Sequence, residues 1–178
     1  VQVRATTRPQ KGVCVRRLHT FVERATDTHL PAAATPRGMD TAESRRADPL
    51  WAVSPLDGRY AGRTAPLSEY VSEAALIRAR VRVEVRYLVA LADEPGVDLS
   101  VSPAERETLE AVVTGFDDDD ARLVKRLETE GAAGYEATNH EVKAVEYFLR
   151  TWTPERLHPW IHFGLTSEDV NNLAQRLL

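Results

Sequence analysis

Arg59 and Tyr60 stand in a short loop whose residue types could bind an anion. Pro55 and the pair Asp57-Gly58 precede them, and these residues are typical of turns. A guanidinium presents a planar fork of donors that suits phosphate or carboxylate. An exposed loop arginine is most often only solvated, so this segment alone indicates an anion site weakly.

Two further segments place polar side chains at the expected starts of helices. Residues 138–141 have the pattern of a capping box, which would put Asn139 and His140 in the first helical turn. Residues 166–169 have a similar pattern, in which Thr166 and Ser167 supply two hydroxyls. The backbone N–H groups and the dipole of a helix start favour negative charge. Taken alone, an ordinary capping box with an exposed histidine is the simpler interpretation of residues 138–141.

Asn171 and Asn172 give a second reason to expect a functional site near residues 166–169. Both are poor helix formers placed just inside an expected helix, and a local cost without a packing gain indicates a functional site. His162 lies between Ile161 and Phe163 and is interpreted as a packed histidine rather than a base. The loop arginine and the helix starts together predict a site for a small, multiply anionic ligand.

The element before these helix starts is predicted to be one long helix, from about residue 72 to 92. Val81, Val83 and Val85 alternate with charged residues, which is the period of a strand. A strand of about 20 residues would far exceed the usual length, and the alanine-rich lead-in also favours a helix. We therefore expect a helix with apolar rows wide enough to pack on two sides.

The other elements are also predicted to be helices, so the expected fold class is all-α. Ser102 and Glu105 form a capping box for a helix over 103–114, and further helices are expected over 121–130, 142–151 and from 166 onward. Val145, Phe148, Leu149 and Trp152 are available for burial on the helix over 142–151. Residues 117–120 are four aspartates at a helix start, and we expect no metal there because consecutive side chains point in different directions.

The composition narrows the function classes. The chain has 178 residues, one cysteine and a net charge of −4. One cysteine excludes an internal disulfide framework and a cysteine-rich zinc site. The acidic balance argues against a general nucleic-acid binder, and no apolar run reaches the ~18 residues needed to cross a bilayer.

Residues 1–38 differ in charge from the rest of the chain. They hold seven basic and two acidic residues, whereas residues 39–178 hold 16 basic and 25 acidic ones, and the boundary falls at Met39, the single methionine. We interpret residues 1–38 as upstream sequence outside the fold. The alternative is an arginine-rich transit peptide of an organellar enzyme.

Four strings of the sequence resemble the N-terminal part of the adenylosuccinate lyase family, within the fumarase/aspartase superfamily. They are residues 52–60, 82–88, 138–149 and 161–172. The resemblance implies an extended or disordered extension over 1–50, an N-terminal helical domain over 51–165 and the start of the first central-bundle helix over 166–178. The last helix has no terminator before Leu178, so we expect the chain to be a fragment.

The resemblance also implies an activity. The family releases fumarate by β-elimination from adenylosuccinate, giving AMP, and from the succinyl-carboxamide intermediate SAICAR, giving AICAR, in purine nucleotide biosynthesis. It implies a cytoplasmic homotetramer with small-molecule substrates, without metal or organic cofactor and without nucleic acid or membrane as partner.

The resemblance assigns binding roles to seven residues of this chain. Arg59 and Tyr60 match the family's pair near the nucleotide phosphate, and Thr166 and Ser167 match its pair at the succinyl carboxylates. The substrate-binding triplet is matched by Asn139, His140 and Glu141. The family usually has aspartate at the third position of that triplet, and the extra methylene of Glu141 moves its carboxylate by about one bond.

The resemblance places no catalytic residue in this chain, because the general-acid histidine and the general-base serine are expected beyond Leu178. The 178-residue chain alone is therefore predicted to be inactive. The alternative is a truncated product that only binds nucleotide or other subunits.

Overall fold

The computed structural model describes residues 48–178, and the chain divides into two units, Val1–Ser54 and Pro55–Leu178. In the described part of the first unit, the 3-10 helix η1 (Pro49–Trp51) begins after Asp48, whose carboxylate accepts a hydrogen bond from the Leu50 N–H at 2.9 Å. The extension is predicted over residues 1–50, and its first 47 residues, including the segment 1–38, lie outside the described residues.

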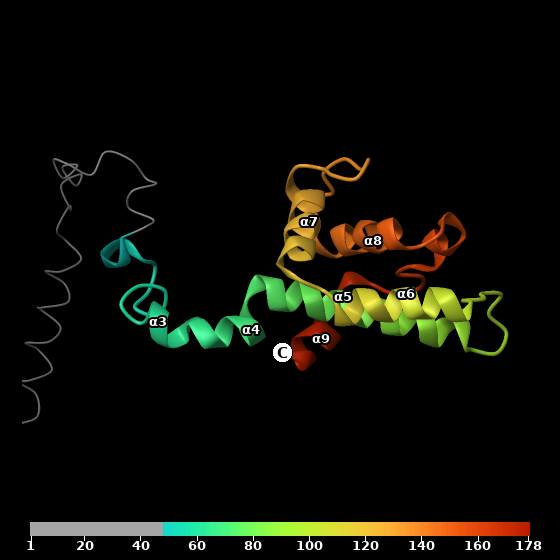
Figure 1. The fold of residues 1–178 in the computed structure, drawn as a ribbon, viewed down its shortest axis with the longest axis horizontal. Helices are drawn as coiled ribbons and strands as arrows, with labels where there is room; N and C mark the ends of the chain where they lie inside the picture. Colours follow the sequence, from blue (N-terminus) through green and yellow to red (C-terminus); the bar gives the residue numbers. More distant parts are fainter. Residues whose placement is uncertain (1–47) are drawn as a thin grey trace, which may run out of the picture. The chain divides into compact units, whose positions relative to one another are not determined.

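The second unit is built from helices (Figure 1). Its elements are α3 (Ala61–Thr64), η2 (Ala65–Leu67), α4 (Ser68–Val71), α5 (Glu73–Ala92), α6 (Pro103–Thr114), α7 (Asp118–Thr129), α8 (Glu141–Trp152), η3 (Glu155–Trp160) and α9 (Ser167–Leu177). The described residues hold no strand, only an isolated bridge between Ala132 and Tyr135. The predicted all-α class is confirmed. Within residues 48–178, no helix is both long and apolar enough to cross a membrane.

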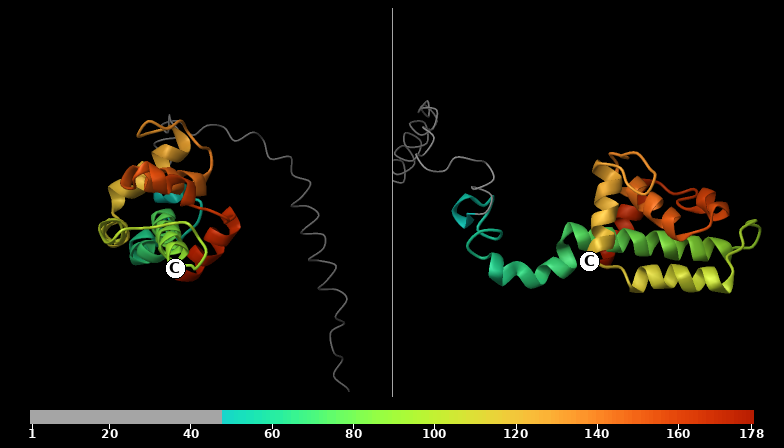
Figure 2. Two further views of the ribbon diagram at one scale, coloured as in Figure 1. Left: turned by 90° about the vertical axis from the view of Figure 1, so that its right-hand side faces the viewer. Right: turned by 45° about the horizontal axis from the view of Figure 1, so that its top comes forward.

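Helix α5 is the predicted long helix, and Ser72 caps it by accepting a hydrogen bond from the Ala75 N–H at 3.1 Å. Val81 and Val85 are buried in one apolar cluster, while Val83 is buried in a second cluster with Val170 of α9. The alternation of valines with charged residues therefore reflects burial of a helix on two sides and not a strand. Helix α5 packs against other helices on two sides (Figure 2). Both sets of valines are therefore buried.

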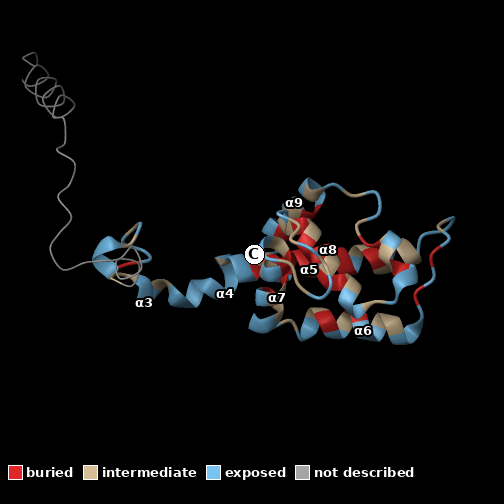
Figure 3. Ribbon diagram, turned by 90° about the horizontal axis from the view of Figure 1, so that it is seen from above, coloured by how far each residue is buried: buried red, intermediate tan, exposed pale blue. Residues whose placement is uncertain are grey.

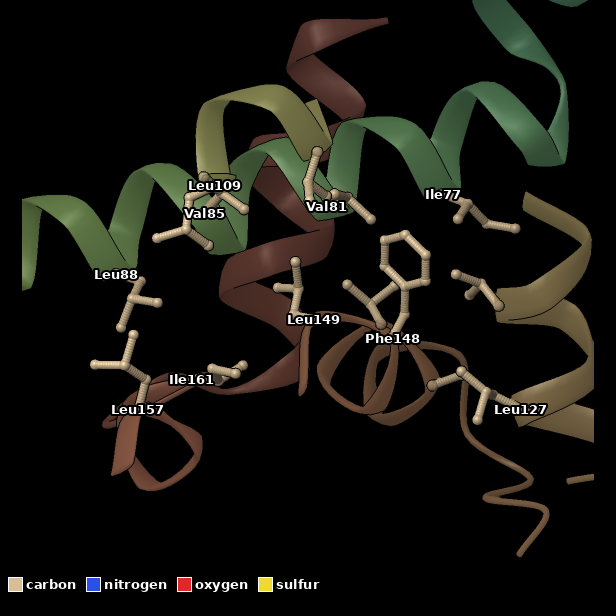
Figure 4. Packing of buried hydrophobic residues seen from close by; sticks show 14 of the residues in the cluster. Ile77, Val81, Val85, Leu88, Leu109, Leu127, Phe148, Leu149, Leu157 and Ile161 are labelled. Atoms are coloured by element: carbon tan, nitrogen blue, oxygen red, sulfur yellow. The ribbon is translucent and has the colours of Figure 1, made fainter. Parts of the chain in front are cut away.

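The main core lies between α5, α6, α7, α8 and η3 (Figures 3 and 4). Its largest fully buried side chain is Phe148 of α8, which meets the ring of Phe116 edge-on at 5.8 Å between centroids. Val145 and Leu149 of the same helix are buried as expected. Trp152 is not buried as expected. It is the last residue of α8 and stays 48% exposed, and its ring lies 6.4 Å from that of Phe148 between centroids.

Two of the three predicted capping boxes are present, at the starts of α6 and α9. In α6 the Ser102 hydroxyl accepts from the Glu105 N–H, and the Glu105 carboxylate accepts from the Ser102 N–H. Thr166 and Asp169 do the same at α9. Helix α7 also begins with a box, because the Asp117 carboxylate accepts from the Asp120 N–H and the Asp120 carboxylate accepts from the Asp117 N–H. Within the described part of the chain, no group of three or more histidine, cysteine or carboxylate side chains is placed to hold a metal ion.

Candidate functional site

The start of α8 is set by the loop that returns from α7. Gly131 turns this loop with φ 87°, and a side chain there would come within 2.8 Å of the Tyr135 carbonyl oxygen. The N–H groups of Thr138 and Asn139 then donate to the Leu127 and Glu128 carbonyl oxygens, at 3.0 and 2.8 Å. The loop is thereby held along the end of α7, and the chain enters α8 from a fixed position.

The predicted capping box over residues 138–141 is wrong. Asn139 adopts φ +50°, so the helix begins later and its cap is His140. The Thr138 hydroxyl stays in the loop, where it donates to the His140 carbonyl oxygen at 2.9 Å and accepts from the His140 N–H at 3.2 Å. Asparagine is one of the few residues that tolerate the left-handed region, and the capping pattern carries no sign that it does so here.

His140 joins the second and third predicted segments. Its Nδ1 accepts a hydrogen bond from the Lys143 N–H at 3.4 Å, and its Nε2 lies 3.4 Å from the Ser167 hydroxyl oxygen. Because Nδ1 acts as an acceptor, the proton of the neutral ring is assigned to Nε2, which then donates to Ser167. Two helix starts that are 27 residues apart in the sequence therefore meet at one place.

At the start of α9, the Thr166 side chain is already engaged. Its N–H and its hydroxyl both donate to the same Asp169 carboxylate oxygen at 2.8 Å. These bonds lower the pKa of Asp169, led by the backbone bond. Thr166 therefore shapes the helix start, while Ser167 carries the hydroxyl that faces His140.

Arg59 and Tyr60 contact each other but not the two helix starts. The Arg59 guanidinium donates to the Tyr60 hydroxyl at 2.9 Å and lies 4.6 Å from the centre of its ring. Arg63 approaches the same ring at 5.8 Å. Within residues 55–178, no hydrogen bond or ion pair joins Arg59 or Tyr60 to residues 139–141 or 166–167.

Glu141, the first residue of α8, lies beside a group that the sequence alone does not single out. Its carboxylate is 3.6 Å from the guanidinium of Arg80, which is only 7% exposed in the middle of α5. The Arg80 Nε donates to the Asn171 side-chain oxygen at 2.8 Å. The pKa of Glu141 is lowered, first by its own backbone N–H at the helix start and then by Arg80, His140 and Asn171 against an opposing effect of burial. The sequence signal that could indicate Arg80 is its position, because it is a charged residue within the apolar rows of α5.

His162 is packed, as its neighbours in the sequence suggest. Its Nδ1 lies 2.6 Å from a carboxylate oxygen of Glu84, whose side chain is fully buried in α5. Burial raises the pKa of Glu84, and the hydrogen bond from His162 opposes that rise. His162 has φ +62°, and the Tyr87 hydroxyl donates to the next carbonyl oxygen, that of Phe163, at 2.8 Å. These contacts hold the loop that leads to the start of α9.

The buried Glu84 predicts a pH-dependent effect of Glu84→Gln. The folded-state pKa of Glu84 is raised, so its contribution to stability is present below the ordinary value near 4.5 and is lost as pH rises through the folded value. Glutamine stays neutral and can still hydrogen-bond to His162. The variant should therefore melt higher than the parent at pH 8, and this gain should shrink at pH 4.

Thermal unfolding followed by circular dichroism at both pH values measures the difference between variant and parent. Glu107→Gln, at an exposed position of α6, is the control and should show no such trend. A gain for Glu84→Gln that is equal at pH 4 and pH 8 would contradict the assignment.

No protein-family model matches the chain. The curated proteins to which it is similar are named as lyases. The adenylosuccinate lyase of Dictyostelium discoideum is 36% identical over 149 residues, which cover 76% of this chain and 30% of that protein. The adenylosuccinate lyase of Escherichia coli K12 is 41% identical over 136 residues, and that of Haemophilus influenzae 39% over 137, each covering 72% of this chain and 28% of the relative. The chain belongs to the adenylosuccinate lyase family and spans less than a third of the length of these relatives.

Proposed function

We propose that this chain forms part of the substrate site of an adenylosuccinate lyase. The reaction is β-elimination of fumarate from adenylosuccinate, leaving AMP, and from SAICAR, leaving AICAR. The observation that carries the proposal is the 3.4 Å approach of His140 Nε2 to the Ser167 hydroxyl. It joins the two motif segments that the family resemblance associates with substrate binding.

The chemistry of the paired helix starts supports an anionic substrate. The N–H groups of a helix start, a serine hydroxyl and an imidazole donor are the groups that bind carboxylates and phosphates in proteins. In the proposed site, Asn139, His140 and Glu141 contact the substrate from α8, and Thr166 and Ser167 bind the succinyl carboxylates from α9. Because the Asp169 carboxylate already occupies the Thr166 hydroxyl, Ser167 is the stronger candidate of the two.

We assign the phosphate of the nucleotide to Arg59 and Tyr60. The support is chemical, because a guanidinium can hold a phosphate by two parallel hydrogen bonds. The contact of Arg59 with Tyr60 also presents both side chains together on one loop.

Elimination also needs a base for the carbon-bound proton and an acid for the leaving nitrogen. The resemblance assigns these groups to parts of the family outside this chain, so we infer that the chain supplies substrate contacts only. We further infer from the resemblance a cytoplasmic homotetramer that acts in purine nucleotide synthesis without metal or cofactor. In that assembly, residues 51–165 would form the N-terminal helical domain, residues 166–178 would begin a central helix, and residues 1–50 would be an extension.

A chimeric enzyme tests the proposal. The matched segment of the E. coli relative is replaced by that of this chain, and fumarate release from adenylosuccinate and from SAICAR is followed by absorbance. We expect turnover by the chimera and none by the 178-residue chain alone. A chimera that assembles like its parent but does not bind adenylosuccinate would contradict the proposed site.

The second candidate is a truncated product that binds nucleotide without catalysis, and the 3.4 Å contact within a single chain is compatible with it. Calorimetric titration of the 178-residue chain with AMP separates the two. Tight binding by the isolated chain would favour this candidate. Absence of binding, together with an active chimera, favours a site completed by other parts of the enzyme.

A further inference from the structure

Arg80 is a buried cation at the junction of three helices. It lies in the middle of α5 with a side chain only 9% exposed, and it reaches α9 through Asn171 and α8 through Glu141. A buried arginine is tolerated when its donors are paired, since an unpaired buried charge is costly. Its two partners are the residues that follow the two helix starts of the proposed site.

Asn171 pairs with the buried cation from α9. Its side-chain oxygen accepts a hydrogen bond from the Arg80 Nε at 2.8 Å. Leucine at this position would lose that bond. This accounts for a poor helix former inside α9.

Arg80 joins Glu141 and Asn171 beside the contact of His140 with Ser167. Glu141 follows His140 directly, and Asn171 stands four residues after Ser167, on the same face of α9. A change in the spacing of Glu141 and Asn171 therefore changes the spacing of His140 and Ser167. The Arg80–Glu141 distance of 3.6 Å is that of an ion pair, which fixes orientation weakly. The 2.8 Å hydrogen bond between Arg80 and Asn171 is directional and orients the guanidinium.

We propose that Arg80 is a positioning residue that sets the approach of His140 to Ser167 by holding Glu141 and Asn171. The meaning of this role for substrate binding rests on the proposed function. Within residues 55–178, no hydrogen bond or ion pair joins Arg80 to His140 or Ser167 directly. Its effect passes through the first turn of α8 and the second turn of α9.

The test uses the isotope-labelled 178-residue chain without any ligand. In the parent we expect a nuclear Overhauser effect between the His140 ring and the Ser167 β-protons, together with a Glu141 pKa below its ordinary value. In Arg80→Met we expect loss of that effect and a rise in the Glu141 pKa. Arg86→Met is the matched control, because Arg86 lies on the same helix but pairs with exposed Glu110 of α6, and it should change neither signal.

Asn171→Ala keeps the test decisive if Arg80→Met does not fold. It removes the Arg80–Asn171 bond with a better helix former at a position that is not buried, and it should also lose the His140–Ser167 signal. A folded Arg80→Met or Asn171→Ala chain that keeps this signal at full intensity would overturn the proposal, even if its melting temperature falls. Because no substrate is present, an inactive chimera would disprove the proposed function and leave this result standing.

Discussion

Replacement of Phe148 by alanine should lower the free energy of unfolding by about 3–5 kcal/mol, the usual cost of removing a large buried aromatic side chain. Phe148 has no exposed surface, and it lies in the core between α5 and α7 (Figure 4). Its ring makes edge-on contacts with Phe116 and Trp152, at 5.8 and 6.4 Å between centroids. Alanine would leave a cavity that these helices can close only in part.

Urea denaturation followed by circular dichroism measures this loss. Phe163→Ala is the matched control, because Phe163 is 52% exposed and its replacement should cost less than about 1 kcal/mol. Phe148→Leu should fall between the two, since leucine refills part of the volume. If Phe148→Ala and Phe163→Ala destabilised the chain equally, the placement of Phe148 at the centre of the core would be wrong.

Ser167→Ala should lower kcat/KM of the chimeric enzyme by about 10- to 100-fold. This range corresponds to the loss of a hydrogen bond to a charged group, about 1.5–3 kcal/mol. The serine hydroxyl faces His140 across 3.4 Å and would donate to a succinyl carboxylate in the proposed site. Its removal leaves the α9 cap in place, because Thr166 and Asp169 form that cap.

Steady-state fumarate release gives kcat and KM for the Ser167→Ala chimera. Ser68→Ala is the control for the same chemical change, because the Ser68 hydroxyl bonds only to the carbonyl oxygen of Ala65 in its own turn. The control should keep kcat/KM within about twofold of the parent chimera. Equal kcat/KM values for the Ser167→Ala chimera and the parent chimera would contradict the placement of Ser167 in the binding site.

The helices were predictable where local chemistry decides them. Ser102, Thr166 and Asp117 satisfy the backbone N–H groups of the first turns that they cap, and these contacts span only two or three residues. The residues before α8 show the limit of such patterns. A left-handed Asn139, held by backbone bonds to the end of α7, moved the cap from Thr138 to His140.

The site was predictable by residue type but not by arrangement. His140 and Ser167 were identified from helix-start patterns, yet only their 3.4 Å contact shows that the two starts meet. The sequence does not identify Arg80 and Glu84, because a charged residue in a helical pattern is expected to be exposed to solvent. Their burial is known only from the structure. Their partners, Asn171 and His162, lie 91 and 78 residues away in the sequence.

The sequence by itself determined the helical class, the length of α5 and the kinds of side chain available to bind an anion. Apolar periodicity and capping are short-range effects, so they can be recognised without the fold. Only the tertiary structure decided which helix starts meet, which charges are buried and which asparagine pairs with Arg80. Those outcomes depend on the packing of α8 and α9 on two sides of α5, and this packing joins residues whose separation in the chain carries no local signal.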